Sequence, residues 1–340
     1  PGDGRSSVIL DLFAGPGGWD EGLKMRGRTD VIGAEIDEWA CATATAAGHE
    51  RLFHRKADVY GLKPDRFAGV EGLIASTPCQ GFSPAGLKAG IGDMGIVRDL
   101  ISGMAQGIDR RAEVFFDIAD LRSIHMVEPL RFAMELRPRW VACEQVPAVL
   151  PLWELTAEAL RAIGYQTWTG VLSSERYGVP QTRRRAFLLA HLDRQPAPPV
   201  ATHSAYYPGD PTRLDAGVER WVSMSDALGV EDDGRLYVSS KMDNSARRSM
   251  SEPAPTIAFG NAAMDAGWMT PGGGGHGSPD FTRVSEVEAA VLQSFRADYP
   301  WRGPTSERFQ QIANAVPPRM AAAVVGGLLG VGRVEAGIVA

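Results

Sequence analysis

Between residue 8 and about residue 190, short apolar runs alternate with longer stretches whose apolar positions recur every three to four residues. The short runs predict buried strands, and the longer stretches predict amphipathic helices. The predicted strands are 8–11, 31–35, 73–76, 140–144, 167–172 and 186–190, and the predicted helices are 38–47, 125–136 and 152–163. Strands that alternate with helices indicate an α/β fold whose mostly parallel sheet is covered by helices.

The pattern changes after Leu192, where proline, glycine, serine and aspartate become frequent and periodicity is lost. We therefore predict a small, loop-rich second domain over 192–281; the alternative is a disordered linker, although Trp221 and Trp268 supply part of a core. Helical periodicity returns at 284–295 and 317–329. The large domain is thus expected to be discontinuous, comprising 1–191 and 282–340.

Composition places the chain among ordinary globular proteins. The 340 residues are 44% apolar and 22% charged, and no apolar run approaches membrane-spanning length, so we expect a cytoplasmic protein without a membrane partner. Three cysteines at irregular spacing match neither a disulfide framework nor a zinc site, so no metal is expected. The net charge of −6 means that any nucleic-acid contact must use local basic clusters such as 110–111, 183–185 or 247–248.

Cys79 follows the predicted strand 73–76, at the edge where α/β enzymes carry their chemistry. Turn-forming residues follow it, which places the thiol on a loop. A single cysteine is more often an apolar filler than a nucleophile. What favours a chemical role here is the set of motifs elsewhere in the chain.

Five blocks occur in order, at 11–19 (DLFAGPGGW), 75–86 (ASTPCQGFSPAG), 144–146 (EQV), 181–185 (QTRRR) and 311–316 (QIANAV). Together they closely resemble the motifs of the DNA cytosine-5 methyltransferases of prokaryotic or phage type, as found in restriction-modification systems. The resemblance spans about residues 8 to 330. It implies a Rossmann-like fold that uses S-adenosylmethionine, with 192–281 as target-recognition domain and 90–119 as an insertion to which the sequence assigns no role.

The resemblance also implies residue roles. The catalytic residues would be Cys79, Glu144, Arg183 and Arg185. The residues binding S-adenosylmethionine would be Phe13, Ala14, Gly15, Gly17, Gly18, Glu35, Ile36, Asp58, Pro78, Asn314, Ala315 and Val316, with Trp39 as an alternative to Ile36 near the adenine. The residues binding DNA would be Gln80, Ser83, Arg122, Arg247, Thr256, Ile257 and Asn261. The expected partner is duplex DNA bound by a monomer, with a restriction endonuclease as a functional rather than physical partner.

These residue types suit methylation of cytosine at carbon 5. The ring is a poor nucleophile until a thiolate adds to carbon 6, and Cys79 would be that thiolate. A carboxyl group at N3, here Glu144, would neutralise the charge that develops, and Arg185 would bind the exocyclic oxygen while Arg183 orders the loop. The target base must first be flipped out of the duplex.

Other readings explain the sequence less well. A zinc deaminase would need a second cysteine where Phe82 stands and a His-x-Glu motif, and the glycine spacing from Gly15 lacks the third glycine of a nicotinamide-binding loop. An RNA methyltransferase of the transfer-RNA type uses the same blocks and remains an alternative. A catalytically silent DNA-binding regulator is disfavoured because Cys79, Glu144, Arg183 and Arg185 are all present.

Overall fold

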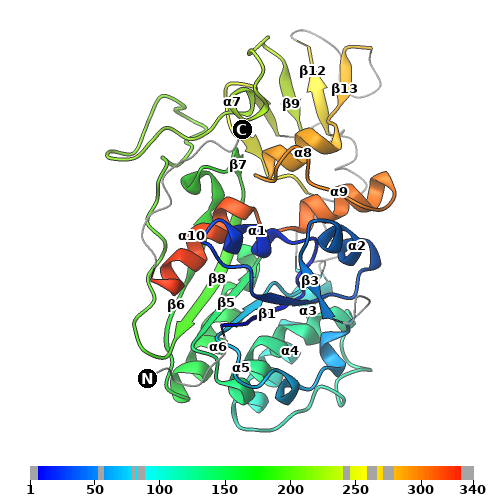
Figure 1. Ribbon diagram of the computed structural model, residues 1–340, viewed down its shortest axis with the longest axis vertical. Coiled ribbons are helices and arrows are strands. Elements are labelled where there is room, and N and C mark those ends of the chain that lie inside the picture. The colour runs from blue at the N-terminus through cyan, green and yellow to red at the C-terminus, as the bar shows by residue number, and fades with distance from the viewer. Residues whose placement is uncertain are drawn as a thin grey trace.

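The computed structural model is built on a seven-stranded sheet (Figure 1) and describes residues 7–52, 57–78, 81–82, 89–239, 246–258, 266–270 and 279–330. The strand order is β3-β2-β1-β4-β5-β8-β6. These strands are β1 (Ile9–Leu12), β2 (Val31–Ala34), β3 (Glu50–Arg51), β4 (Gly72–Ala75), β5 (Trp140–Gln145), β6 (Gln166–Ser173) and β8 (Arg184–His191). β8 is antiparallel to both of its neighbours, and the other pairs are parallel.

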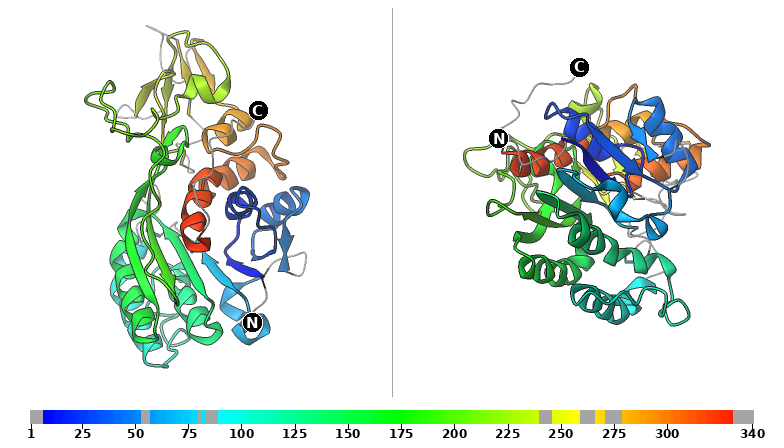
Figure 2. Two further views of the ribbon diagram at one scale, coloured as in Figure 1. Left: turned by 60° about the vertical axis from the view of Figure 1, so that its left-hand side comes forward. Right: turned by 60° about the horizontal axis from the view of Figure 1, so that its bottom comes forward.

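Helices cover both faces of this sheet, because alternate residues of its strands are apolar on both sides. Leu10 and Leu12 of β1 face a core shared with α4 (Met94–Ala105), α5 (Glu128–Leu136) and α6 (Leu150–Ala162). Ile9 faces a second core shared with α1 (Gly18–Lys24) and α10 (Pro318–Leu329). Figure 2 shows α10 on one side of the strands and the α4 to α6 layer on the other.

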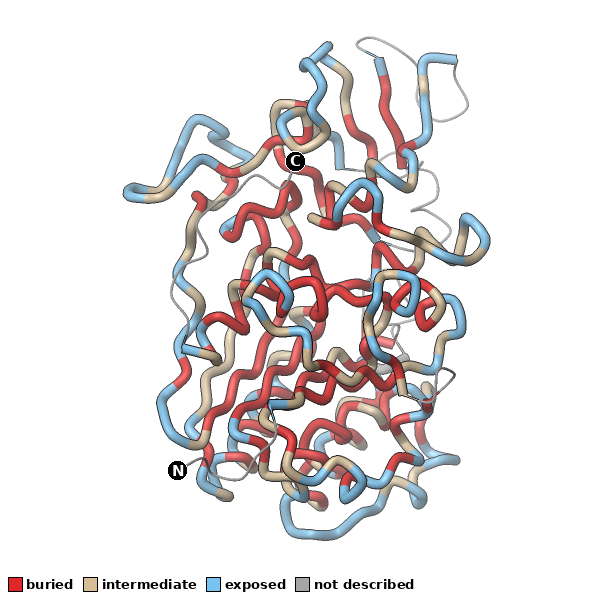
Figure 3. The backbone as a smooth tube through the Cα atoms, in the orientation of Figure 1, coloured by how far each residue is buried: buried red, intermediate tan, exposed pale blue. Residues whose placement is uncertain are grey.

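The second region carries its own small antiparallel sheet, in the order β10-β9-β12-β13. Its strands are β9 (Leu236–Val238), β10 (Arg247–Ser249), β12 (Gly267–Met269) and β13 (Phe281–Arg283), next to α7 (Met224–Leu228). A third core joins Tyr237 and Trp268 of this sheet to Ala290 and Ile312, on α8 (Glu286–Leu292) and α9 (Thr305–Asn314). Figure 3 shows buried backbone running from the large sheet into this region, with exposed loops at its outer end.

Short elements complete the chain. They are α2 (Glu38–Ala46), α3 (Ala89–Gly92), the paired strands β7 (Gln181–Thr182) and β11 (Ala254–Pro255), and the 3-10 helices η2 (Val59–Gly61), η3 (Pro64–Phe67), η4 (Leu121–Val127), η5 (Pro147–Val149) and η6 (Ser174–Tyr177).

The predicted strands of the large sheet are confirmed, each with small shifts at its ends. The helix predicted over 125–136 becomes an α-helix only at Glu128, after the 3-10 helix η4 and with Pro129 in its first turn. The segment 90–119 contains α4, whose Val97, Leu100 and Ile101 are buried in the core. That segment is therefore an integral part of one helical layer. The proposed domain boundary at 281/282 stays a prediction; it falls inside β13.

Among the residues that the structure describes, the stretch Thr305–Leu329 is long and apolar enough to cross a membrane. It consists of α9 and α10, and 72% of its most apolar window is buried inside the protein. Burial of this kind is typical of a core helix, so the stretch is weak evidence for a membrane span.

Candidate active site

A cavity of about 400 Å³ opens where β1, β2, β4 and β5 end. β1 and β4 are neighbours, and the chain order reverses between them, which is the usual position of a ligand crevice in such a sheet. Of the residues predicted from the sequence, the cavity is lined by Phe13, Ala14, Gly15, Gly18, Glu35, Ile36, Asp58, Pro78, Arg122, Glu144, Arg183, Arg185, Asn314, Ala315 and Val316. Gly17 and Trp39 are not among the lining residues.

The loop after β1 and the acid after β2 hold each other in place. The Glu35 carboxylate accepts hydrogen bonds from the backbone N–H of Gly15 (2.7 Å), Ile36 (2.7 Å) and Asp37 (2.8 Å). Burial raises the pKa of Glu35, and the three N–H donors oppose that rise. The carboxylate is thus held in one orientation at the edge of the cavity.

The loop after β1 also packs directly against the block 311–316. A Cβ atom added at Gly18 would lie 2.2 Å from the carbonyl oxygen of Val316, so only glycine allows this approach. Gly17 has φ of 116°, and the Tyr299 hydroxyl next to it donates to Pro16 O (2.6 Å). The C-terminal segment thus lies directly beside the loop after β1.

Buried charged side chains also hold the loop after β1 in place, and the sequence analysis did not identify them. The fully buried Arg51 side chain donates to the Asp20 carboxylate (3.0 Å) and to the carbonyl oxygen of Gly15 (3.1 Å). Burial, with Asp20 nearby, raises the pKa of Asp11 well above its ordinary value, although Arg51 opposes the rise. In the sequence Arg51 follows His49 and Glu50, so no local pattern distinguished it from other charged residues.

Glu144 and Arg185 form an ion pair at the cavity wall, with 2.9 Å between Glu144 Oε1 and Arg185 Nε. Glu144 lies near the end of β5, and Arg185 lies near the start of β8. Because β8 is antiparallel to β5, its first residues meet the last residues of β5 at the same edge. Both side chains are largely buried, at 7% and 12% exposure.

Arg183 is buried beside this pair and also lines the cavity. Its guanidinium donates to the carbonyl oxygen of Ile257 (3.2 Å), and its backbone N–H donates to Ser174 Oγ (3.0 Å). Arg183 therefore connects the sheet edge that carries Glu144 and Arg185 to Ile257 in the second region.

Cys79 lies outside the described residues, as do Gln80, Ser83 and Asn261, but the strand end before Cys79 is well anchored. Ser76 Oγ accepts from the indole N–H of Trp19 (2.8 Å), and the carbonyl oxygen of Thr77 accepts from the Gln145 side chain (2.7 Å). Pro78 lines the cavity. Gln145, which follows Glu144, thus anchors Thr77, two residues before Cys79.

The other two cysteines, Cys41 and Cys143, are buried and are not joined in a disulfide. Burial raises the pKa of Cys41 to about 11 and raises that of Cys143 further. Thiols of this kind are poor nucleophiles. Within the part of the chain that the structure describes, no group of three or more His, Cys, Asp or Glu residues could hold a metal ion.

The residues predicted to bind DNA occupy different settings. Arg122 is exposed at the cavity and pairs with Asp120 (2.8 Å), while Arg247 is exposed on the edge strand β10. Thr256 Oγ1 donates to Thr182 O (3.0 Å), and the buried Ile257 donates its N–H to the Gln181 side chain (3.0 Å). Thr256 and Ile257 are thus bound to the block 181–185. The role of all four residues in DNA binding stays a prediction.

The cavity also includes residues that the sequence reasoning did not select. His125 contacts the Phe13 ring edge-on, with centroids 5.2 Å apart, and burial lowers its pKa. Glu307, Gln310 and Gln311 come from α9. α9 was not predicted, because its sequence is mostly polar.

Comparison with known proteins identifies the family of this chain. The family model for C-5 cytosine-specific DNA methylases matches residues 8–259. Among relatives, a type II methyltransferase, M.DdeI of Desulfomicrobium norvegicum, is 28% identical over 55% of this chain and 41% of its own length. M.NgoBI of Neisseria gonorrhoeae is 28% identical over 64% and 62%, and M.AplI of Arthrospira platensis is 27% identical over 93% and 84%. The chain therefore spans less than two thirds of the first two relatives.

Solved structures share the fold along nearly the whole chain. The Dnmt2 methyltransferase of S. pombe has a TM-score of 0.62 at 17% identity and covers 96% of this chain and 99% of its own. The Entamoeba histolytica methyltransferase EhMeth has a TM-score of 0.60 at 12% identity, with the same coverage. These similarities confirm the Rossmann-like methyltransferase fold.

Proposed function

Because the chain belongs to the C-5 cytosine-specific DNA methylase family, we propose that it transfers a methyl group from S-adenosylmethionine to carbon 5 of a flipped-out cytosine in a specific duplex DNA sequence. The observation that carries this proposal is one cavity that is lined both by Glu35 and by the Glu144–Arg185 ion pair. A site for the methyl donor and an acid–arginine pair for the base are thereby adjacent.

The residues present fit S-adenosylmethionine. A cavity of about 400 Å³ is within the usual range for a small ligand, and Gly15, which lines it, has open space where a Cβ atom would stand, so a ligand can approach its backbone closely. The Glu35 carboxylate would accept from the ribose hydroxyls, and Asp58 would accept from the adenine amino group. When bound, S-adenosylmethionine supplies a methyl group on a positively charged sulfur.

Cys79 is the proposed nucleophile. Its Sγ would form a bond to carbon 6 of cytosine, and the electron pair of the C5–C6 double bond would move toward N3 and carbon 5. Glu144 would hold a proton at N3, which makes carbon 5 nucleophilic. After methyl transfer, loss of the C5 proton to water and release of Cys79 would restore the aromatic ring.

Arg185 has two tasks in this scheme. Its ion pair orients Glu144, and the remaining N–H groups of its fork would reach the exocyclic oxygen of the base. Arg183 would support the nucleophile loop from its buried position beside Ile257. We assign base-edge contacts in the recognised sequence to the region 192–281 and place a monomer on the duplex, with any cognate restriction endonuclease acting separately.

The direct test is to incubate the protein with methyl-labelled S-adenosylmethionine and either duplex DNA of random sequence or transfer RNA. We expect label in DNA, as 5-methylcytosine in one sequence context. Label in transfer RNA alone would replace this proposal with the RNA-methyltransferase alternative. Absence of label in both, from protein that binds S-adenosylhomocysteine, would favour a silent DNA-binding protein.

A further inference from the structure

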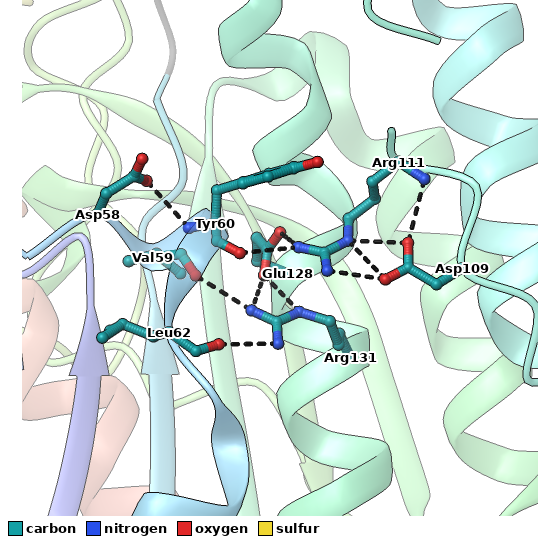
Figure 4. A network of polar contacts seen from close by, with 8 residues as sticks. All are labelled: Asp58, Val59, Tyr60, Leu62, Asp109, Arg111, Glu128 and Arg131. Atoms are coloured by element: carbon teal, nitrogen blue, oxygen red, sulfur yellow. Dashed lines mark hydrogen bonds and ion pairs between the residues drawn. The ribbon is translucent and has the colours of Figure 1, made fainter. Parts of the chain in front are cut away.

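The turn 58–62 forms one wall of the cavity, through Asp58 and Val59. Its backbone carbonyls are held by two arginines (Figure 4). Arg131 donates to the carbonyl oxygens of Val59 (3.1 Å) and Leu62 (3.0 Å), and Arg111 donates to that of Tyr60 (3.2 Å). The wall therefore depends on side chains from outside the turn.

Both arginines are anchored on one buried carboxylate, that of Glu128. Arg111 Nη1 lies 2.6 Å from Glu128 Oε1, and Arg131 Nε lies 2.8 Å from Glu128 Oε2. Glu128 is fully buried, which raises its pKa, while Arg131 and Arg111 oppose the rise. A buried acid between two guanidiniums forms a geometrically specific network, and removal of one partner is costly.

Arg111 comes from the segment 90–119, which the sequence left without a role. Asp109 binds the other side of its guanidinium, at 2.9 Å from Nε and 2.7 Å from Nη2. The guanidinium also lies over the Tyr60 ring (4.7 Å), and Phe115 contacts that ring edge-on (5.6 Å). The segment thus contacts the 58–62 turn through both its backbone and its only aromatic ring.

Asp58 is linked to this network through Tyr60. Asp58 Oδ1 accepts from the backbone N–H of Tyr60 (3.0 Å), the residue whose carbonyl oxygen Arg111 holds. Because Asp58 Oδ1 is bound to the Tyr60 N–H, the direction in which Asp58 Oδ2 points depends on the position of the Tyr60 backbone. A shift of Tyr60 would therefore turn the carboxylate that faces the cavity.

We propose that Arg111 is a positioning residue, by which the segment 90–119 fixes Asp58 for recognition of the adenine amino group of S-adenosylmethionine. This inference rests on the proposed function. A lysine could not replace Arg111, because one ammonium cannot reach Tyr60 O, Glu128 and Asp109 in the planar arrangement of a guanidinium.

The test measures binding, by calorimetry, of S-adenosylhomocysteine and of S-inosylhomocysteine, which lacks the adenine amino group. Wild-type protein should prefer the adenosyl ligand by about tenfold or more, since a site built for a hydrogen bond rejects the analogue without it. Arg111→Ala should weaken the adenosyl ligand by about tenfold and the inosyl ligand little, so that the preference falls toward one. Asp58→Ala should lose the same preference.

Arg110→Ala is the matched control, because it removes the same charge from the neighbouring, exposed position, where Arg110 lies 3.9 Å from Glu113. It should keep the wild-type preference. If Arg111→Ala does not fold, Arg111→Lys takes its place, with the same expected loss of preference and a melting temperature as the check on folding.

The outcomes separate the two proposals. Folded Arg111 variants that keep the wild-type preference, or that weaken both ligands equally, overturn the positioning role and leave the proposed function intact. An unchanged preference in Asp58→Ala also overturns it. Wild-type protein that binds neither ligand overturns the proposed function itself, and the inference with it.

Discussion

Substitution of Gly18 by alanine should damage both the fold and the cofactor site. Gly18 begins α1 and lines the cavity, and its added Cβ would lie 2.2 Å from Val316 O and 3.2 Å from two further Val316 backbone atoms. Since the obstacle is backbone, no side-chain rotation relieves it. The loop and the C-terminal motif must move apart instead.

The size of the effect follows from that displacement. Real Cβ atoms stay at about 3.0 Å or more from such neighbours, so the added Cβ would lie about 0.8 Å too close to Val316 O. Overpacking of this kind lowers the free energy of unfolding by about 1–3 kcal/mol. Because Gly18 and Val316 both line the cavity, we expect the Kd for S-adenosylhomocysteine to rise by about tenfold or more.

Two other glycines separate stability from ligand binding. Gly22→Ala would place a Cβ 2.5 Å from the Ala321 Cβ, between α1 and α10 and away from the lining residues. It should destabilise the protein comparably while changing the Kd by less than about threefold. Gly327 is exposed within α10 with nothing within 4 Å, so Gly327→Ala should stabilise by about 0.5–1 kcal/mol.

Urea unfolding gives the free energy of unfolding, and calorimetry gives the Kd. The reasoning is refuted if Gly18→Ala matches wild type in both measurements. It is also refuted if Gly22→Ala weakens the ligand as much as Gly18→Ala does, because the loss would then reflect general destabilisation.

Four further predictions concern chemistry, pH and site choice. Cys79→Ala should abolish methylation but keep S-adenosylhomocysteine binding, and wild type should form a covalent adduct with DNA containing 5-fluorocytosine; active protein that traps no adduct contradicts the nucleophile assignment. Glu144→Gln should lower kcat by about a hundredfold with little change in cofactor Kd, and wild-type turnover in this variant would remove its role at N3. Burial raises the pKa of Glu175 from its ordinary value of 4.5 to about 7, so the stabilising contribution of the protonated side chain is complete below about pH 4.5 and is lost as pH rises through 7. The free energy of unfolding of Glu175→Gln, measured in urea, should therefore rise by about 2 kcal/mol relative to wild type between about pH 5 and 8. Equal pH dependence of the two free energies would exclude this role. Arg247→Ala should alter site choice or DNA affinity without changing cofactor affinity, and the reverse result would count against 192–281 as the recognition region.

Local sequence patterns determined the strands of the large sheet, because a buried strand needs a short apolar run and little else. They also indicated the positions of Glu35 and Glu144, since each acid directly follows such a run. Gly15 and Gly18 were found through the resemblance of the block 11–19, and the structure supplies the reason for Gly18, whose backbone approaches Val316 too closely for a side chain.

Only the tertiary structure decided which distant residues meet. The Glu144–Arg185 pair depends on the antiparallel placement of β8 beside β5, and periodicity carries no information on strand order. The contact of Gly18 with Val316 joins positions almost 300 residues apart. Arg111 and Glu128 are likewise ordinary charged residues in the sequence, and they support a wall of the cavity only because packing places one buried carboxylate between two guanidiniums.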